Sequence, residues 1–353
     1  MTAETIPRHY AYVTRMVIKL FREGALSNVA SVEVEPEWGY TTRLRYSSGA
    51  TRITYGNDIG LNAGAATELA RDKAYTKLFL KNMGAHAPEG SAFLFPWWAD
   101  RMNPMRRPAT VRTTESATAY ACDELGLPVY VKPVDGSKGI GVSRCETRTD
   151  VTAALAELDK LRTKLALVEK AVDLPDYRLV MLNGELISAY RRTALSVTGD
   201  GELTVRALID RLDAEFRASG RDTRITPRDQ RIARHLRHLG LGLDSVPQKG
   251  EILRLLDISN LSAGGTAEDV TSQVAQHWRD FLSTVAEEFG LNFCGMDLLC
   301  SDITDAAATY SLLELNSAPG LDHYAFVGES QAQVVRALYA KVLNVPPARG
   351  HHG

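Results

Sequence analysis

The chain has 353 residues, of which 44% are hydrophobic and 24% are charged, and its formal net charge is −2. This length allows two or three modest domains with cores of their own, and the near-neutral charge gives no indication of a nucleic-acid or membrane-surface partner. The four cysteines form no Cys-x-x-Cys pair, so neither a disulfide framework nor a structural zinc site is expected. Without a signal-peptide pattern or an apolar run long enough to cross a bilayer, the sequence predicts a cytoplasmic protein.

Helical and strand patterns alternate along the chain, which is typical of an α+β protein. Apolar residues at helical spacing predict helices at residues 10–21, 65–84, 115–126, 149–162, 203–220, 227–240, 277–290 and 331–344. Alternating or apolar runs predict strands at residues 31–36, 41–48, 127–133, 165–172, 293–302 and 309–316, and a hairpin at 177–193 that turns on Asn183-Gly184. Residues 91–108 hold three prolines and two tryptophans, and we expect an irregular insertion there.

The stretch DGSKGIGV, residues 135–142, joins two predicted strands. Its glycines Gly136, Gly139 and Gly141 allow backbone N–H groups to approach a ligand closely, and Lys138 adds positive charge. The stretch is neither a Walker A loop nor a Rossmann turn, because GxxxxGK[ST] is absent and no helix follows it directly. The pattern favours a hairpin that closes over phosphate groups, with a plain flexible hairpin as the alternative.

Polar residues also stand inside apolar strands. Lys132 in VYVKP would be costly to bury unless it meets an anion, although an edge-strand lysine can reach solvent instead. Glu314 and Asn316 in LLELN share one strand face, because side chains alternate. Asp297 is the acid of the preceding apolar strand; if the two strands are antiparallel neighbours, the three side chains converge on an oxygen-ligand set that suits Mg²⁺. For Glu314 and Asn316 the alternative is a half-exposed edge strand with solvated side chains, and for Asp297 it is a turn cap.

Taken in order, these segments resemble an ATP-grasp carboxylate–amine ligase, and they are most similar to the ATP-grasp modules of cyanophycin synthetase and of bifunctional glutathione synthetase. The segments that carry the resemblance are DKAYTK (72–77), YVKPVDGSKGIGV (130–142), the region 167–193, VTGDGELTVRALID (197–210), NLSAGGTAEDVT (260–271), GMDLL (295–299) and LLELNSAPGL (312–321). The resemblance implies an α+β ATP-grasp fold, in which two α+β subdomains clamp ATP. The implied division is a short, reduced N-terminal region at 1–64, a small subdomain with the phosphate loop and the 91–108 insertion at 65–167, and a large subdomain with the Mg²⁺ site at 168–346.

The resemblance also implies roles for individual residues. Those that would bind ATP are Lys73, Lys132, the phosphate-loop residues Gly136, Ser137, Lys138, Gly139 and Gly141, the hinge residues Glu169, Lys170 and Val172, and Asp176 at the ribose. The Mg²⁺ ligands would be Asp297, Glu314 and Asn316, and the substrate loop would contribute Asn260, Ser262, Gly264 and Gly265. The groups that would act on the reacting atoms are Arg178, Arg192, Lys132 and Arg254. Related ligases carry an arginine four residues before the NLS motif; here that position is Leu256, and Arg254 is the candidate to replace it.

The implied reaction joins the carboxylate of one amino acid to the amine of a second through an acyl phosphate and releases ADP and phosphate, with a glutamyl dipeptide as one expected product. The expected cofactors are ATP and two Mg²⁺ ions, for which Mn²⁺ can substitute, and a homodimer or homotetramer is expected. One alternative is a peptide or specialised-metabolite substrate, docked at Trp97, Trp98, Arg106 and Arg107, although a dimer contact or a packed insertion is favoured for these four residues. Another is a nucleotide-binding regulator without catalysis, which the complete set of three metal ligands disfavours. The arginines of 206–237 alternate with acids at helical spacing, which is typical of a solvated face and not of a nucleic-acid site.

Overall fold

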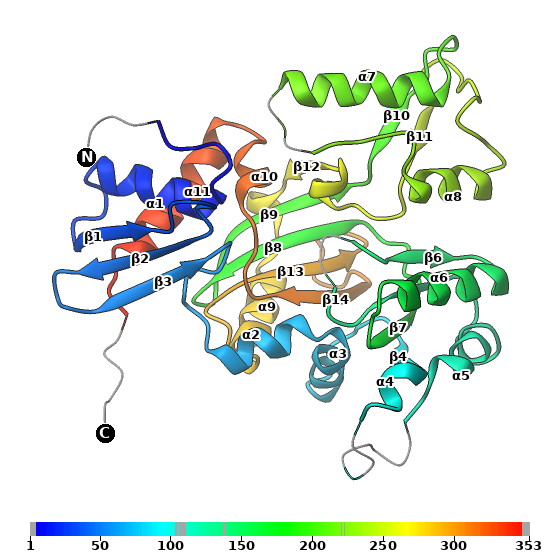
Figure 1. The fold of residues 1–353 in the computed structure, drawn as a ribbon, viewed down its shortest axis with the longest axis horizontal. Helices are drawn as coiled ribbons and strands as arrows, with labels where there is room; N and C mark the ends of the chain where they lie inside the picture. Colours follow the sequence, from blue (N-terminus) through cyan, green and yellow to red (C-terminus); the bar gives the residue numbers. More distant parts are fainter. Residues whose placement is uncertain are drawn as a thin grey trace.

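The computed structural model describes residues 5–102, 105, 111–136, 139–219, 221 and 223–347. Its centre is a five-stranded antiparallel sheet in the order β12-β9-β8-β13-β14 (Figure 1). The strands are β8 (Asp176–Leu182), β9 (Glu185–Thr193), β12 (Thr266–Asp269), β13 (Phe293–Cys300) and β14 (Tyr310–Asn316). β8 and β9 form the predicted hairpin, and its turn residues Asn183 and Gly184 have φ of 49° and 79°, which confirms that prediction.

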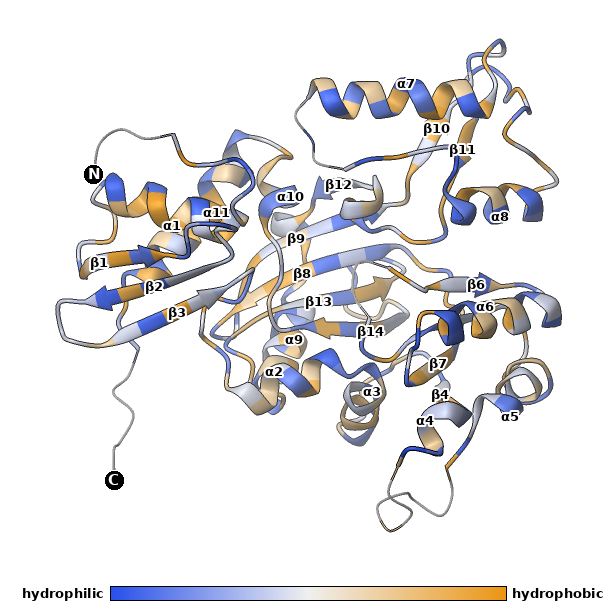
Figure 2. Ribbon diagram, viewed as in Figure 1, coloured by the Kyte–Doolittle hydropathy of each residue, from blue (hydrophilic) through white to orange (hydrophobic). Residues whose placement is uncertain are grey.

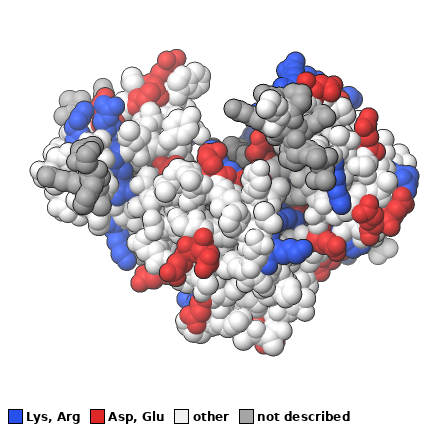
Figure 3. Space-filling model, turned by 90° about the horizontal axis from the view of Figure 1, so that it is seen from below, with Lys and Arg blue, Asp and Glu red and all other residues white. Residues whose placement is uncertain are grey.

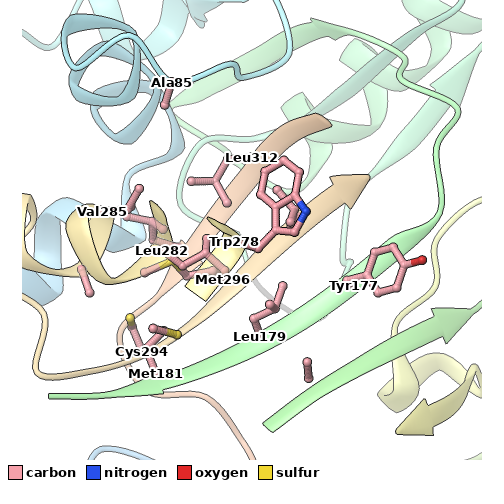
Figure 4. Close-up of a cluster of buried hydrophobic side chains, with 14 of the residues drawn as sticks. Ala85, Tyr177, Leu179, Met181, Trp278, Leu282, Val285, Cys294, Met296 and Leu312 are labelled. Atoms are coloured by element: carbon pink, nitrogen blue, oxygen red, sulfur yellow. The ribbon is translucent and has the colours of Figure 1, made fainter. Parts of the chain in front are cut away.

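The main core lies on one face of this sheet, beneath helix α9 (Gln276–Glu288). Figure 4 shows Leu282 of α9 beside Met296 of β13 and Trp278 of α9 near Leu312 of β14, in the cluster that also contains Leu179 of β8. These side chains are almost fully buried, with Trp278 only 1% exposed. Helices α2 (Gly64–Arg71) and α3 (Lys73–Asn82) contact β14 at the edge of the same sheet. The core therefore holds β13 and β14 rigidly side by side.

A second sheet has four strands in the order β4-β7-β5-β6. These are β4 (Gly90–Leu94), β5 (Val129–Pro133), β6 (Ser143–Cys145) and β7 (Leu165–Lys170). Helix α6 (Arg148–Lys160) packs on it and begins with a capping box, in which Thr147 and Asp150 satisfy each other's backbone N–H groups. The short helices α4 (Pro96–Ala99) and α5 (Thr114–Ala119) and a π-helical turn at Tyr120–Leu125 complete this layer.

The N-terminal segment forms a three-stranded sheet of β1 (Val29–Val34), β2 (Thr41–Tyr46) and β3 (Thr51–Tyr55). It shares a core with α1 (Tyr12–Arg22) and with α11 (Glu329–Leu343) from the other end of the chain. The side chain of Tyr46 donates to the Leu343 carbonyl at 2.8 Å, and Arg52 donates to the Val345 carbonyl at 3.0 Å. The two ends of the chain are therefore one packed unit.

A further lobe consists of the ribbon β10 (Ser196–Thr198) with β11 (Ile252–Arg254) and the helices α7 (Val205–Ala218) and α8 (Gln230–His238). In Figure 2, α7 alternates between blue and orange, as an amphipathic helix over a small core does. α8 contacts the second sheet and its helix: Arg234 donates to Ser143 Oγ of β6 at 2.5 Å and to Glu157 of α6 at 3.1 Å. The lobe thus contacts the strand that follows the glycine-rich stretch.

Two sequence predictions are wrong. The helix expected at 65–84 is two helices, because the backbone of Asp72 is extended, with φ of −87° and ψ of 102°, and its carboxylate caps α3 by accepting from the N–H groups of Ala74 and Tyr75. The segment 91–108 is not irregular at its start, since residues 90–94 form β4 and pair with β7. Residues 103, 104 and 106–110 of that segment, which include Arg106 and Arg107, lie outside the described residues.

No helix in the described ranges combines the length and apolar character needed to cross a bilayer. On the face shown in Figure 3, Lys and Arg side chains are interspersed with Asp and Glu.

Candidate functional site

A cavity of about 470 Å³ lies between the second sheet, the central sheet and the segment that follows β11. Its size is that of a small-molecule site. Thirteen residues singled out from the sequence line it: Lys73, Lys132, Gly136, Gly139, Glu169, Lys170, Val172, Asp176, Arg192, Arg254, Asn260, Asp297 and Glu314. Arg178, Asn316, Gly141, Ser262, Gly264 and Gly265 are not part of its wall, and Ser137 and Lys138 lie outside the described residues.

Lys132 of β5 meets an anion, which is the carboxylate of Glu169. This pair was not predicted from the sequence. The Lys132 ammonium contacts one oxygen of Glu169 on β7, and Lys77 of α3 contacts the other. β5 and β7 are adjacent strands, with Lys132 opposite Leu167, so Glu169 lies within reach. Burial alone would raise the pKa of Glu169, but the two ammonium groups hold it below its usual value. Lys77 was missed because its partners lie far away in the sequence.

Asp297 lies at the centre of a buried charge cluster. Arg178 of β8 donates to both of its oxygens, and Arg192 of β9 reaches it at 2.9 Å. Arg192 also donates to Asp176 at 2.7 Å. Burial by itself would raise the pKa of Asp297, but the two guanidinium groups hold it well below its usual range. Burial and the neighbouring Asp297 charge raise the pKa of Asp176.

Strands β13 and β14 are antiparallel neighbours, and Asp297 pairs with Glu314 across them while Asn316 pairs with Gly295. This confirms the strand arrangement on which the metal prediction depended. Glu314 lies 3.5 Å from the ammonium of Lys73, which also donates to the Gly136 carbonyl at 2.8 Å. The Asn316 side-chain oxygen accepts from the N–H of Ala318 at 3.1 Å.

These donors fit magnesium in kind, because carboxylate and amide oxygens are the ligands that Mg²⁺ prefers. The described residues contain no group of three or more His, Cys, Asp and Glu placed to hold a metal without further ligands. A metal at this site therefore depends on the Asn316 amide or on oxygens that a ligand brings. It also competes with Arg178 and Arg192 for Asp297.

The glycine-rich stretch lies against the substrate-loop segment. Gly139 has φ of 70°, and a Cβ placed there would lie 2.4 Å from Ile258 and 3.0 Å from the Asn260 amide, so only glycine fits. Gly141, also at φ of 70°, and Ser262 line a second cavity of about 680 Å³. Both cavities include Gly139 in their walls.

Gly264 and Gly265 do not line the first cavity and are instead packed closely against neighbouring residues. A Cβ on Gly265 would lie 2.7 Å from the Thr193 carbonyl, and one on Gly264 would lie 2.8 Å from Leu195. Arg221, which the sequence reading did not single out, holds this loop by donating to the Leu261 carbonyl at 2.7 Å and the Gly265 carbonyl at 2.5 Å.

At the hinge between the sheets, Lys170 and Val172 line the cavity. Lys170 is the last residue of β7, and its ammonium donates to the carbonyl of Gly126, in the turn before β5, at 2.8 Å. Arg254 lines the cavity too, and it donates to the carbonyls of Leu256 and Asp257 at 2.7 Å and 2.6 Å. Arg254 thus stabilises the turn that contains Leu256, the position where related ligases carry arginine.

Comparison with known proteins identifies a family and several relatives of this chain. The family model described as D-ala D-ala ligase C-terminus matches residues 99–200. Cyanophycin synthetase of Crocosphaera subtropica is 30% identical over 267 residues, which are 72% of this chain and 28% of that protein. The glutathione biosynthesis bifunctional protein of Mannheimia succiniciproducens is 24% identical over 309 residues, which are 84% of this chain and 38% of that protein.

Among solved structures, the bifunctional glutathione synthetase from Pasteurella multocida superposes with a TM-score of 0.57 at 20% identity, over 94% of this chain and 44% of that one. The chain spans less than half the length of each of these relatives. The sequence and structure comparisons agree with the expected fold class and with the relatives that the motifs indicated. The chain has the ATP-grasp fold and is a relative of cyanophycin synthetase and of the bifunctional glutathione synthetases.

Proposed function

We propose that the chain is an ATP-dependent ligase that joins the carboxylate of one amino acid to the amine of a second and releases ADP and phosphate. The observation that supports this most is the 470 Å³ cavity, which brings two lysines, the glycine-rich stretch and the carboxylates of Asp297 and Glu314 together from segments far apart in the sequence. Binding of a nucleoside triphosphate requires that combination of cations, backbone donors and metal-binding oxygens.

Charge neutralisation is the main task of such a site, because phosphoryl transfer needs alignment and electrostatic stabilisation more than covalent help. Lys73 of α3 and Lys132 of β5 both line the cavity. The hinge at Lys170 and Val172 would border the adenine, and Asp176 would lie at the ribose. The backbone from Gly136 to Gly141 would cover the phosphates.

Magnesium would be held by Asp297, Glu314 and Asn316, and it would supply positive charge beside the transferred phosphate. Mn²⁺ has similar ligand preferences and is expected to substitute. Arg178 and Arg192 both form ion pairs with Asp297. With a metal held at that carboxylate, the guanidinium groups of Arg178 and Arg192 would bind carboxylate and acyl-phosphate oxygens bidentately.

The amine of the second substrate would then attack the acyl phosphate, and phosphate would leave. An acyl phosphate hydrolyses readily in water, so the segment from Asn260 to Gly265 and the glycine-rich stretch must exclude water during the reaction. The close approach of Gly139 to Ile258 and Asn260 means that these two segments are already in contact.

The test is ADP and phosphate release with Mg-ATP, measured across single amino acids and pairs of them. We expect release with a specific pair and a product mass equal to the sum of both minus water. Release with one amino acid alone would indicate acyl-phosphate formation with the amine absent. Tight binding of ATP with no turnover on amino acids, peptides or related metabolites would instead support a non-catalytic nucleotide-binding regulator. Analytical ultracentrifugation of the same sample would decide between monomer, dimer and tetramer.

A further inference from the structure

The proposed function uses the first lysine of the DKAYTK motif, Lys73, and leaves the second, Lys77, without a role. Lys77 lies one helical turn further along α3 and points inward, with 11% of its side chain exposed. Its ammonium contacts one oxygen of Glu169 and donates to the Pro88 carbonyl at 3.0 Å. Both partners belong to the second sheet or its approach, so Lys77 connects α3 to the wall of the cavity.

Glu169 is shared. It is 1% exposed, and its other oxygen contacts Lys132, which is 5% exposed. A carboxylate with one lysine would form a neutral pair, but this carboxylate has two. The group of three therefore carries one excess positive charge in a buried position, and such a charge is costly unless an anion offsets it.

Of these three residues, Lys132 and Glu169 line the 470 Å³ cavity, and Lys77 lies behind them. We infer that Lys77 is a positioning residue for this site: it fixes Glu169 so that the same carboxylate holds Lys132 in place, and it supplies the excess positive charge that the phosphates of a bound nucleotide offset. This inference rests on the proposed function.

The geometry makes nucleotide binding sensitive to pH. Burial, first of all, and the charges of Lys132 and Lys73 lower the pKa of Lys77 to about 8, although Glu169 opposes that shift. The charged groups that face it are Glu169 on β7, Lys132 on β5 and Lys73 on its own helix, where Lys73 is itself paired with Glu314. Below about pH 8 Lys77 is protonated and the excess positive charge is present. Above that pH Lys77 is neutral and the excess charge is lost. An anion that binds there raises the pKa of Lys77, so Lys77 takes up a proton and regains its charge.

The experiment measures the dissociation constant of a non-hydrolysable ATP analogue by calorimetry between pH 7.5 and 9.5, in two buffers of different ionisation enthalpy. Wild type should bind about tenfold more weakly at pH 9.5 than at pH 7.5, as expected for the loss of one nearby charge, and should take up protons on binding near pH 8.5. Lys77→Met should bind at every pH about as weakly as wild type does at 9.5, with no proton uptake from this site. Lys77→Arg should keep tight binding at every pH, because a guanidinium stays charged.

Lys81→Met is the matched control, because Lys81 is an exposed lysine on the same helix; it should follow wild type. If Lys77→Met fails to fold, the flat profile of Lys77→Arg carries the test. A profile for Lys77→Arg that slopes as wild type does, or wild-type affinity and proton uptake in Lys77→Met, would overturn the inference while leaving nucleotide binding intact. A wild-type protein that binds no analogue at any pH would refute the proposed function itself.

Discussion

The charge cluster around Asp297 makes a quantitative prediction about stability. Four buried or nearly buried groups, Arg178, Arg192, Asp176 and Asp297, balance as two positive and two negative charges. Asp297→Asn keeps the shape but leaves one excess positive charge, and Arg178 then has no carboxylate partner among these groups. Removing one member of a buried ion pair costs about 3–5 kcal/mol. A domain of ordinary stability, about 5–15 kcal/mol, would lose a large share of it.

The assay is urea unfolding followed by circular dichroism, without nucleotide. With an m-value near ~3 kcal/mol/M, the loss corresponds to a midpoint lower by about 1–1.7 M. Arg178→Leu combined with Asp297→Asn returns the cluster to one positive and one negative charge, and it should recover most of the stability. Asp244→Asn is the control, because it breaks an exposed pair with Arg206, whose side chains are 86% and 49% exposed; such pairs contribute about 0–1 kcal/mol.

The effect should depend on pH with a definite sign. The folded pKa of Asp297 lies below its unfolded value, so its contribution is fully present above about pH 4 and is lost as pH falls below that. The difference between wild type and Asp297→Asn should therefore stay constant from pH 8 to 5 and shrink only in acid. A single variant within about 0.5 kcal/mol of wild type at pH 7, or a double variant less stable than the single, would refute the electrostatic account.

Four further substitutions separate the site from the scaffold. Glu314→Gln should lower ADP formation at least about a hundredfold with an unchanged circular dichroism spectrum; turnover near wild type would remove this residue from the metal site. Lys132→Met should raise the KM for ATP about tenfold or more, and an unchanged KM would discredit its contact with phosphate. Gly139→Ala should reduce turnover about tenfold and lower the free energy of unfolding by about 1–2 kcal/mol through backbone strain; unchanged turnover would refute a role of this backbone in the reaction. Trp278→Ala should lower the free energy of unfolding by about 3–5 kcal/mol, measured by urea, and a loss below about 1 kcal/mol would show that the core has repacked around it.

Local patterns predicted the elements whose causes are local. The hairpin at Asn183-Gly184 follows from two residues that accept positive φ, and the strand at 309–316 follows from alternation. The prediction of one helix at 65–84 was wrong at a single residue. Asp72 can serve as an N-cap only if the helix is interrupted there, and the apolar spacing on both sides gives no sign of that interruption. β4 was not predicted, because the prolines and tryptophans that follow it are typical of irregular structure.

The partners of the site residues were harder to predict, because they depend on register between strands. That Lys132 would be buried with an anion could be stated from VYVKP, but the choice of Glu169 depends on how β5 lies beside β7. Likewise, the residues around Asp297 in the sequence do not predict its ion pairs with Arg178 of β8 and Arg192 of β9. The sequence therefore predicted thirteen of the residues that line the cavity, but not Lys77 and not how the buried groups share their charges.

The junction between the two ends of the chain has a consequence for synthesis. The sheet β1-β2-β3 and helix α1 leave the ribosome before helix α11, which covers them and lies far downstream in the sequence. At about 5–20 residues per second, the wait is on the order of tens of seconds. During that time the apolar side chains of Val13, Val17 and Leu20, all fully buried in the finished protein, have no permanent cover. We expect the nascent chain to need a holding chaperone in this interval, and slow translation to increase its aggregation.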